Sequence, residues 1–272
     1  MILDGRTLAK EMLARAKARA AKLARPPRVL AIVASETLAT KSYLAIKTKR
    51  AADAGCVLDV KQFSETASTE ELKTAVQESD AEAVIVQLPL PNGVDTKAVC
   101  DALPIEKDAD VLSSAARALF AQAEGALLPP VVGAVREIFI QNAVDPKGKK
   151  AVVIGSGFLV GAPVATWLTR QGAEVSVLTS TSKDFAATLR VADIVVSGAG
   201  SPRFIKPEML KESIILIDAG TSESDGTLAG DADPSCAEKC ALFTPVPGGV
   251  GPLAVACLFE NVVMLAERAM NI

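Results

Sequence analysis

The sequence predicts an α/β protein made of two doubly wound domains with a cleft between them, and three observations favour this fold. Short apolar stretches alternate with helical ones in two successive series, which is typical of parallel sheets. A glycine-rich turn, Gly155 to Gly161, follows the first strand of the second series. The chain has 272 residues, 50% hydrophobic and 22% charged, which is enough for two domains with their own cores.

The first series begins with a helix over residues 6–24, where apolar residues recur at helical spacing until Pro26 and Pro27 end it. We then expect strands at 29–34, 57–63 and 83–88, separated by helices at 40–55 and 69–78. These elements form a first domain, residues 1–125. The last helix, 253–269, must bury its apolar stripe, so we expect segment 250–272 to complete this domain.

A break around residues 121–130 separates the second series, which we assign to a Rossmann-type domain over 126–249. It opens with a helix at 133–142. The elements expected after that are strands at 151–154, 174–178, 194–197 and 214–218, with a helix at 160–171 after the first of them.

The glycines of the second series lie between a strand and a helix, where a nucleotide-binding turn needs them. Glycine permits the tight bend and lets backbone N–H groups approach a pyrophosphate. We therefore predict a dinucleotide cofactor, and a structural turn in a cofactor-free sheet is the alternative. The next strand runs into Thr179-Ser-Thr-Ser-Lys183, without the carboxylate that usually holds the ribose of NAD. Hydroxyls and a lysine at this position would suit the 2′-phosphate of NADP, so we favour NADP over NAD.

Composition excludes several kinds of chemistry. The chain has no histidine, so it has no imidazole base, histidine zinc site or Ser-His-Asp triad. Its five scattered cysteines form no CxxC pair, which favours reduced thiols in the cytoplasm and no metal site. Residues 1–10 lack the apolar core of a signal peptide, and glycines and prolines interrupt both long uncharged stretches, 151–169 and 240–259. We therefore expect neither export nor a membrane span.

The first fifty residues are basic, with 12 lysines and arginines against 3 acidic residues. Aromatic residues make up only 4% of the chain, so stacking platforms for nucleic-acid bases are scarce and we expect no nucleic-acid partner. An anionic small molecule is the better interpretation. The alternative is that these charges simply solvate a helix face.

Four residues in the first domain are candidates for chemistry. Tyr43 and Lys47 are one helical turn apart, although Lys47 could equally be an ordinary surface cation. Their YxxxK spacing is that of short-chain dehydrogenases, but those enzymes place the glycine turn before the pair. Gln87 ends the third strand, at the sheet edge where ligands bind. Asp110 lies in a polar cluster that either forms a solvated loop or directs a carboxylate into a site.

The segment Thr244–Pro252 contains three prolines and three glycines in nine residues. Such a segment fixes some backbone dihedrals and frees others, which suits a backbone wall against a ligand. A stiff connector between domains is the alternative.

Taken together, the motifs resemble those of the bifunctional methylenetetrahydrofolate dehydrogenase/cyclohydrolase family over nearly the whole chain. The motifs that carry the resemblance are Tyr43-Leu-Ala-Ile-Lys47, Val86-Gln-Leu-Pro-Leu-Pro91, Lys107-Asp-Ala-Asp110, Gly155 with Val160-Gly-Ala-Pro163, and Pro245-Val-Pro-Gly-Gly-Val-Gly-Pro252. The resemblance implies that Lys47 is the catalytic lysine, that Gln87 orients it, and that Tyr43 packs on the folate. It also implies that Asp110 holds the pterin.

The remaining site residues also follow from this resemblance. Those expected to line the substrate site are Pro247, Gly248, Gly249 and Pro252. Those expected to contact the cofactor are Gly155, Ser156, Gly157, Thr179, Ser180 and Thr221.

The activity implied is oxidation of methylenetetrahydrofolate with NADP, followed by hydrolysis of the methenyl product to formyltetrahydrofolate. The second step needs a proton transfer, which a buried lysine can supply when its pKa is lowered. The family also implies a cytoplasmic homodimer. A polyglutamylated folate would give the basic front a partner.

Four segments depart from the usual family pattern. Val111–Ser114 replaces Gly-Phe-His-Pro, Leu128–Val131 replaces Pro-Cys-Thr-Pro, Gly155–Gly157 replaces Gly-Arg-Ser, and Leu178–Ser180 replaces Cys-His-Ser. These differences leave open the cofactor choice and whether both activities survive. Two other interpretations remain: a shikimate-type dehydrogenase of similar build, and a non-catalytic folate- or nucleotide-binding protein.

Overall fold

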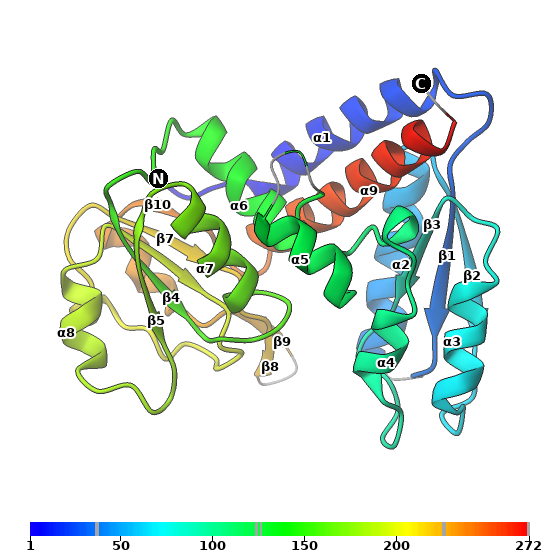
Figure 1. Cartoon of the computed structure of the whole chain (residues 1–272). Coiled ribbons are helices and arrows are strands. Elements are labelled where there is room, and N and C mark those ends of the chain that lie inside the picture. Colours follow the sequence, from blue (N-terminus) through cyan, green and yellow to red (C-terminus); the bar gives the residue numbers. More distant parts are fainter. Residues whose placement is uncertain (36–37, 123–124, 126, 225–226, 271–272) are drawn as a thin grey trace. The chain divides into compact units, whose positions relative to one another are not determined.

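The computed structural model describes residues 1–35, 38–122, 125, 127–224 and 227–270, without the side chains of 38–43 and 223–224. The chain divides into two compact units (Figure 1). Unit 1 comprises Met1–Ala9 and Val131–Ala254, and unit 2 comprises Lys10–Pro130 and Val255–Ile272. The main sheet of each unit is parallel, as the sequence predicted.

The units differ at their boundaries from the expected ranges 1–125, 126–249 and 250–272. Most notably, the first nine residues cluster with unit 1. The reason lies in the backbone: Leu3 N donates to Phe243 O at 2.9 Å, and Phe243 N donates to Met1 O at 2.9 Å. A chain end that pairs with the edge of a sheet folds with that sheet.

The three strands of unit 2 pair in the order β2-β1-β3, so the first strand lies in the middle and the chain winds outward in both directions. The strands are β1 (Arg28–Val33), β2 (Val57–Gln62) and β3 (Ala83–Val86). The helices that accompany them are α2 (Leu38–Asp53), α3 (Thr69–Gln77), α4 (Thr96–Asp101), η1 (Ile105–Lys107) and α5 (Ser114–Gln122). The sequence predicted the strands, α2 and α3, but not the short helices α4, η1 and α5.

The core of unit 2 lies where α3 and α4 cover β1 and β3. Its buried side chains include Ile32, Leu72, Val76, Val84 and Val99. Helix α3 is fixed at its start by a capping box in which Ser68 and Glu71 bond to each other's backbone N–H groups. All four residues of β3 are buried, so the residues that follow this strand emerge from a packed sheet.

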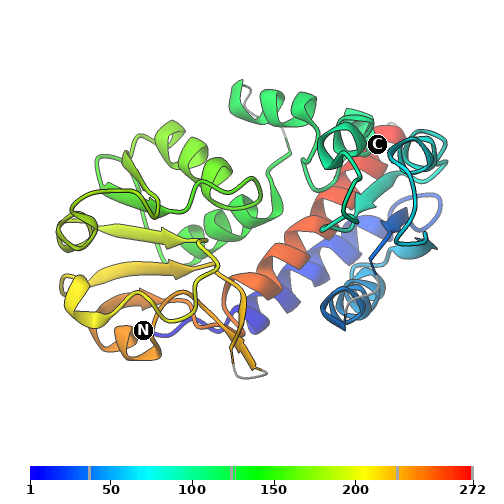
Figure 2. The same ribbon diagram turned by 90° about the horizontal axis from the view of Figure 1, so that it is seen from below.

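The five strands of unit 1 pair in the order β10-β7-β6-β4-β5, again with the first strand between the second and third (Figure 2). They are β4 (Lys150–Ile154), β5 (Glu174–Leu178), β6 (Ile194–Ser197), β7 (Ile214–Asp218) and β10 (Cys240–Phe243). The other elements are α6 (Pro130–Gln141), α7 (Gly161–Arg170), α8 (Phe185–Arg190), η2 (Pro207–Met209), η3 (Pro234–Lys239) and the hairpin β8 (Ser222–Ser224) and β9 (Thr227–Ala229). The sequence did not predict α8, β10 or the hairpin.

Two long helices, α1 (Gly5–Ala20) and α9 (Val250–Ala269), contribute residues to both units. Within unit 2 they lie side by side in both views (Figures 1 and 2), where Arg15 pairs with Glu260 at 3.4 Å and Arg19 with Glu267 at 2.6 Å. Among the described residues, α9 is the one helix long and apolar enough to cross a membrane. In its most apolar stretch 61% of the residues are buried inside the protein, which is also the pattern of a core helix.

Candidate active site

Lys47 and Gln87 form the centre of the candidate site in unit 2. The Lys47 ammonium, carried by α2, donates to Gln87 Oε1 at 3.0 Å. Gln87 directly follows β3 and is 8% exposed, and its own Nε2 donates to Leu88 O at 2.8 Å. Because the amide nitrogen is already occupied, the amide oxygen faces the lysine. The next peptide bond, Leu88–Pro89, is cis.

Asp110 joins this pair electrostatically. It is half-buried, and burial raises the pKa of its carboxyl group. The Lys47 ammonium opposes that rise, which places it within electrostatic reach, while the neighbouring Asp108 adds to the rise. The structure thus joins Lys47 and Gln87 by a hydrogen bond and places Asp110 within electrostatic reach of Lys47.

Asp108 has a different role from Asp110. Its side chain is fully buried and accepts hydrogen bonds from Leu112 N at 3.0 Å and Ser113 N at 2.8 Å. It therefore shapes the turn that follows, in which Val111 adopts a positive φ of 55°. Of the two aspartates in the polar cluster, one builds the loop and the other is available to a ligand.

Sequence reasoning missed Asn261, a buried polar residue of α9. Its Nδ2 donates to Ala109 O at 2.8 Å and to Leu128 O at 2.9 Å. It therefore ties the loop that carries Asp110 to segment 128–131. The available signal was a single amide that, with Glu260, interrupts the apolar residues of 253–265, and an amide in such a place is usually held by a buried hydrogen bond.

Tyr43 is part of α2, one helical turn before Lys47. Its side chain lies outside the described residues, so the expected packing of Tyr43 on the folate stays a prediction.

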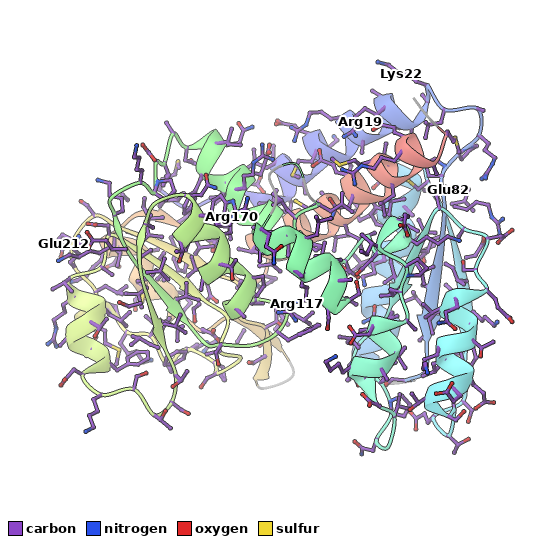
Figure 3. All side chains as sticks on the ribbon, in the orientation of Figure 1. Arg19, Lys22, Glu82, Arg117, Arg170 and Glu212 are labelled. Carbon is purple, nitrogen blue, oxygen red and sulfur yellow. The ribbon has the colours of Figure 1, made fainter. Side chains whose placement is uncertain are left out.

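Several arginines among the first fifty residues pair with carboxylates of unit 2. Arg25 contacts the buried Glu82 at 2.5 Å, and Arg28 contacts Asp80 at 2.9 Å. Arg19 and Glu82 are labelled in Figure 3, where Lys22 lies just beyond the end of α1. These arginines stabilise unit 2, so part of the positive charge of the first fifty residues has a structural explanation.

In unit 1, the glycine turn after β4 has the geometry of a phosphate cradle. Gly155 has a φ of +94°, and a Cβ on Gly161 would lie 2.0 Å from Gly155 O, so both positions require glycine. A Cβ on Gly157 would have no atom within 4 Å, which leaves open space beside the backbone. Gly155 N bonds to Leu178 O at 2.8 Å, so the turn lies beside the end of β5. The turn fits a pyrophosphate.

The loop after β5 is closed by its own hydroxyls. Thr179 N donates to Ser182 Oγ at 2.9 Å, and the Thr179 and Thr181 hydroxyls lie 3.1 Å apart. Ser180 and Lys183 are exposed beside them, as is Thr221 after β7. This edge of the sheet therefore offers hydroxyls and an ammonium group to a ligand, which suits a phosphate better than a ribose diol.

The proline- and glycine-rich segment of unit 1 forms a tight turn against the start of α1. The Val246–Pro247 bond is cis, and Gly248 has a φ of +112°. A Cβ on Gly5 would lie 2.0 Å from Gly249 O, so the two backbones touch. Pro252 follows in the first turn of α9. The four residues expected to line the substrate site thus belong to unit 1, whereas Lys47, Gln87 and Asp110 belong to unit 2.

Sulfur chemistry and metals have little support in the described part of the chain. No group of three potential metal-ligating side chains comes together there. The five cysteines are free and buried, and burial raises the pKa of the Cys56 thiol to about 12.

These features define the class of protein: an α/β protein with a dinucleotide-binding unit and a second unit that carries a lysine, an amide and a carboxylate. Comparison with known families makes the assignment specific. The model of the NAD(P)-binding domain of tetrahydrofolate dehydrogenase/cyclohydrolase matches residues 129–270, and the model of the catalytic domain of the same family matches residues 3–110. The chain belongs to the tetrahydrofolate dehydrogenase/cyclohydrolase family, as the motifs indicated.

Individual relatives agree over the full length. The bifunctional protein FolD of Nitrosospira multiformis is 34% identical over 98% of this chain and 96% of its own. The crystal structure of the bifunctional enzyme FolD from Campylobacter jejuni has a TM-score of 0.95 at 29% identity, covering 99% of both chains. The Trypanosoma brucei enzyme, complexed with NADP and an inhibitor, has a TM-score of 0.95 at 32% identity, covering 100% of this chain and 99% of its own.

A shikimate dehydrogenase from Thermus thermophilus has a TM-score of only 0.54 at 17% identity, covering 89% of this chain and 99% of its own. That likeness concerns the fold alone. The folate family matches the sequence of both domains, so we prefer it to the shikimate-type interpretation.

Proposed function

We propose that this chain oxidises methylenetetrahydrofolate with NADP and hydrolyses the methenyl product to formyltetrahydrofolate. The observation that carries the proposal is the 3.0 Å hydrogen bond from the Lys47 ammonium to Gln87 beside Asp110, in the catalytic domain of a bifunctional family. The glycine turn of the NAD(P)-binding domain supplies the cofactor site.

The oxidation needs no base. A hydride leaves the methylene carbon that bridges two folate nitrogens, and the product is a cation whose charge those nitrogens share, so no proton leaves in this step. When bound, NADP supplies the nicotinamide that accepts the hydride. The residues that would hold the cofactor are Gly155, Ser156, Gly157, Thr179, Ser180 and Thr221. A chain without histidine can therefore catalyse this reaction.

The hydrolysis does need proton transfer. Water adds to the methenyl carbon of the cation and releases one proton to solvent. One carbon–nitrogen bond then breaks as the second proton moves from the former water oxygen to the leaving nitrogen, which leaves a neutral formyl group. Lys47 is placed to relay that proton, and Gln87 holds its ammonium group. Asp110 would accept hydrogen bonds from the pterin, and Tyr43 would pack on the folate. Pro247, Gly248, Gly249 and Pro252 would line the substrate site.

The role of Lys47 is tested by substitution. Lys47→Met should abolish cyclohydrolase activity while folate still binds, because the side chain keeps its length and loses its proton. Lys49→Met, an exposed lysine two residues on, is the matched control and should behave as the wild type. Full hydrolysis by Lys47→Met would show that another group transfers the proton.

The cofactor is tested by assay with methylenetetrahydrofolate and each nicotinamide cofactor in turn, following the absorbance of the methenyl product. We expect NADP to support the faster reaction. Absence of signal with either cofactor would end the dehydrogenase proposal.

We further propose that the protein is a cytoplasmic homodimer and that it accepts polyglutamylated folates. Light scattering coupled to gel filtration should give twice the chain mass of 28.2 kDa. Cell fractionation should place the protein in the cytoplasm. Because basic side chains attract polyanions, a polyglutamylated substrate should give a lower KM than the monoglutamate, with a difference that shrinks as salt is added.

A further inference from the structure

Two buried aspartates connect the loops at the carboxyl edge of the unit 1 sheet. Asp218 ends β7 and is 1% exposed, and Asp231 follows β9 and is fully buried. Neither was singled out by the sequence motifs, and neither takes part in the proton transfer proposed for Lys47. Buried carboxylates are costly unless their hydrogen bonds are satisfied, so the partners of this pair indicate its purpose.

Asp231 organises the segment after β6. Its Oδ2 accepts hydrogen bonds from Ser197 Oγ at 2.6 Å and Ala199 N at 2.7 Å, and its Oδ1 accepts one from Ser201 N at 2.8 Å. The loop that leaves the end of β6 is therefore wrapped around one carboxylate. In a doubly wound sheet, this edge is where the dinucleotide binds.

Asp218 organises the segment after β7. Its Oδ1 accepts hydrogen bonds from Gly220 N at 2.9 Å and Asp231 N at 3.1 Å, and its Oδ2 accepts one from Ala232 N at 2.8 Å. Gly220 directly precedes Thr221, a proposed cofactor contact. The two aspartates are directly linked, because the backbone N–H of Asp231 is one of the donors to the Asp218 carboxylate.

Two glycines make room for this arrangement. A Cβ on Gly220 would lie 2.2 Å from Asp231 Cγ, and a Cβ on Gly230 would lie 2.2 Å from Asp218 Oδ2. Each aspartate therefore packs against the glycine beside the other. A side chain at either glycine would force a carboxylate out of place.

The network continues to the proline- and glycine-rich turn. Asp218 N donates to Thr244 Oγ1 at 2.7 Å, and Thr244 is fully buried directly before that turn. A Cβ on Gly249 would lie 2.8 Å from Thr244 Cβ, so the turn is packed on the threonine. The loops after β6, β7 and β10 are consequently held as one body.

From this we infer that Asp218 and Asp231 are positioning residues for the nicotinamide cofactor: they hold the loops after β6 and β7 in the shape that binds it. The inference rests on the proposed function, since it takes the carboxyl edge of this sheet as the cofactor site. Preorganised loops bind a ligand more tightly because their ordering has already taken place during folding.

The central test is Asp231→Asn in the full-length protein. The substitution replaces one carboxylate oxygen by an NH2 group. That NH2 faces an N–H or O–H group from which the carboxylate had accepted a hydrogen bond, so the loop after β6 loses part of its support. We expect the Kd for NADP, measured by calorimetry, and the KM for NADP to rise by about ten-fold or more. Cyclohydrolase activity should stay within about two-fold of the wild type, because hydrolysis of the methenyl group uses no nicotinamide.

Three further variants test whether the effect is specific to the Asp231 carboxylate. Asp233→Asn is the matched control, because this nearby carboxylate bonds to Ser235 and Lys206 at the surface, and its NADP affinity should be unchanged. Ser197→Ala removes one donor to Asp231 and should give a smaller loss. Gly220→Ala displaces the Asp231 carboxylate without changing its charge and should weaken NADP binding as Asp231→Asn does.

The outcomes separate the inference from the proposed function. If Asp231→Asn and Gly220→Ala bind NADP as tightly as the wild type, the positioning role is overturned and the enzyme activity still stands. Equal losses of NADP binding and cyclohydrolase activity, with a lowered Tm, would also overturn it, because they indicate a general folding role. If the wild type itself neither binds NADP nor shows dehydrogenase activity, the proposed function fails first.

Discussion

The amide oxygen of Gln87 accepts a 3.0 Å hydrogen bond from the ammonium group of Lys47, forty positions earlier in the chain. The amide end of the same side chain donates to Leu88 O, so Gln87 has a single orientation toward the lysine. The position of Lys47 therefore depends on a strand end rather than on α2 alone.

Replacing Gln87 with leucine should slow hydrolysis without unfolding the protein. A hydrogen bond to a charged group contributes about 1.5–3 kcal/mol, so the kcat of the cyclohydrolase reaction should fall by about ten- to a hundred-fold. The oxidation, which transfers no proton, should fall less. Gln62→Leu, at an exposed glutamine of β2, is the control. Equal losses in both reactions would contradict a role in holding the lysine for proton transfer.

Asn261→Leu should disturb the loop that carries Asp110. The substitution leaves Ala109 O and Leu128 O without their donor, and two lost hydrogen bonds of this kind should lower the free energy of unfolding by about 2–4 kcal/mol. The KM for folate should rise while the Kd for NADP stays unchanged. Urea denaturation and steady-state kinetics measure both effects. A variant with wild-type folate KM would show that Asp110 does not need this anchor.

Two glycines of the nucleotide turn should respond differently to alanine. At Gly161 the new Cβ would lie 2.0 Å from Gly155 O, so Gly161→Ala should lower the Tm and weaken NADP binding together. At Gly157 the Cβ would enter open space, so Gly157→Ala should keep its Tm and weaken only NADP binding. Differential scanning fluorimetry and calorimetry distinguish the two. Wild-type NADP affinity in both variants would argue against this turn as the phosphate site.

The stability of unit 1 should depend on pH through Asp218. Burial raises the pKa of this carboxyl group from 3.8 to about 6, and the nearby Asp231 adds to the rise. The folded state therefore holds the proton more tightly than the unfolded state does. The contribution of Asp218 to the free energy of unfolding is complete below about pH 4 and is lost as the pH rises to about 6.

Comparison of the wild type with Asp218→Asn measures this contribution. Between about pH 4 and 6.5 the unfolding free energy of the wild type should fall relative to that of the variant by on the order of 3 kcal/mol. Urea titrations at several pH values give both curves. Carboxyl groups with lowered pKa values, such as Asp101, are present in both proteins. Their effect on the unfolding free energy, which falls at more acidic pH, therefore cancels in the difference. A difference that is constant with pH would show that the pKa of Asp218 is not raised.

The sequence alone predicted the alternating strands and helices, the glycine turn, and the pairing of Lys47 with Gln87. The strands, the helices and the glycine turn are local features, since hydrophobic periodicity and glycine spacing reflect constraints within a few residues. The pairing of Lys47 with Gln87 is not local, and it was implied by the family that the ordered motifs identify. Asp110 could be named in the same way, but the sequence could not tell that the nearby Asp108 holds the backbone of the turn that follows it.

Only the tertiary structure decided which polar residues hold the candidate sites together. Asn261 reaches a loop 152 positions away, and Asp218 and Asp231 gather the N–H groups of loops that follow separate strands. The arginines of the front segment find carboxylates that are distant in sequence, such as Glu82 and Glu267. No local pattern encodes such contacts, because a buried polar group is satisfied by whatever the fold brings beside it.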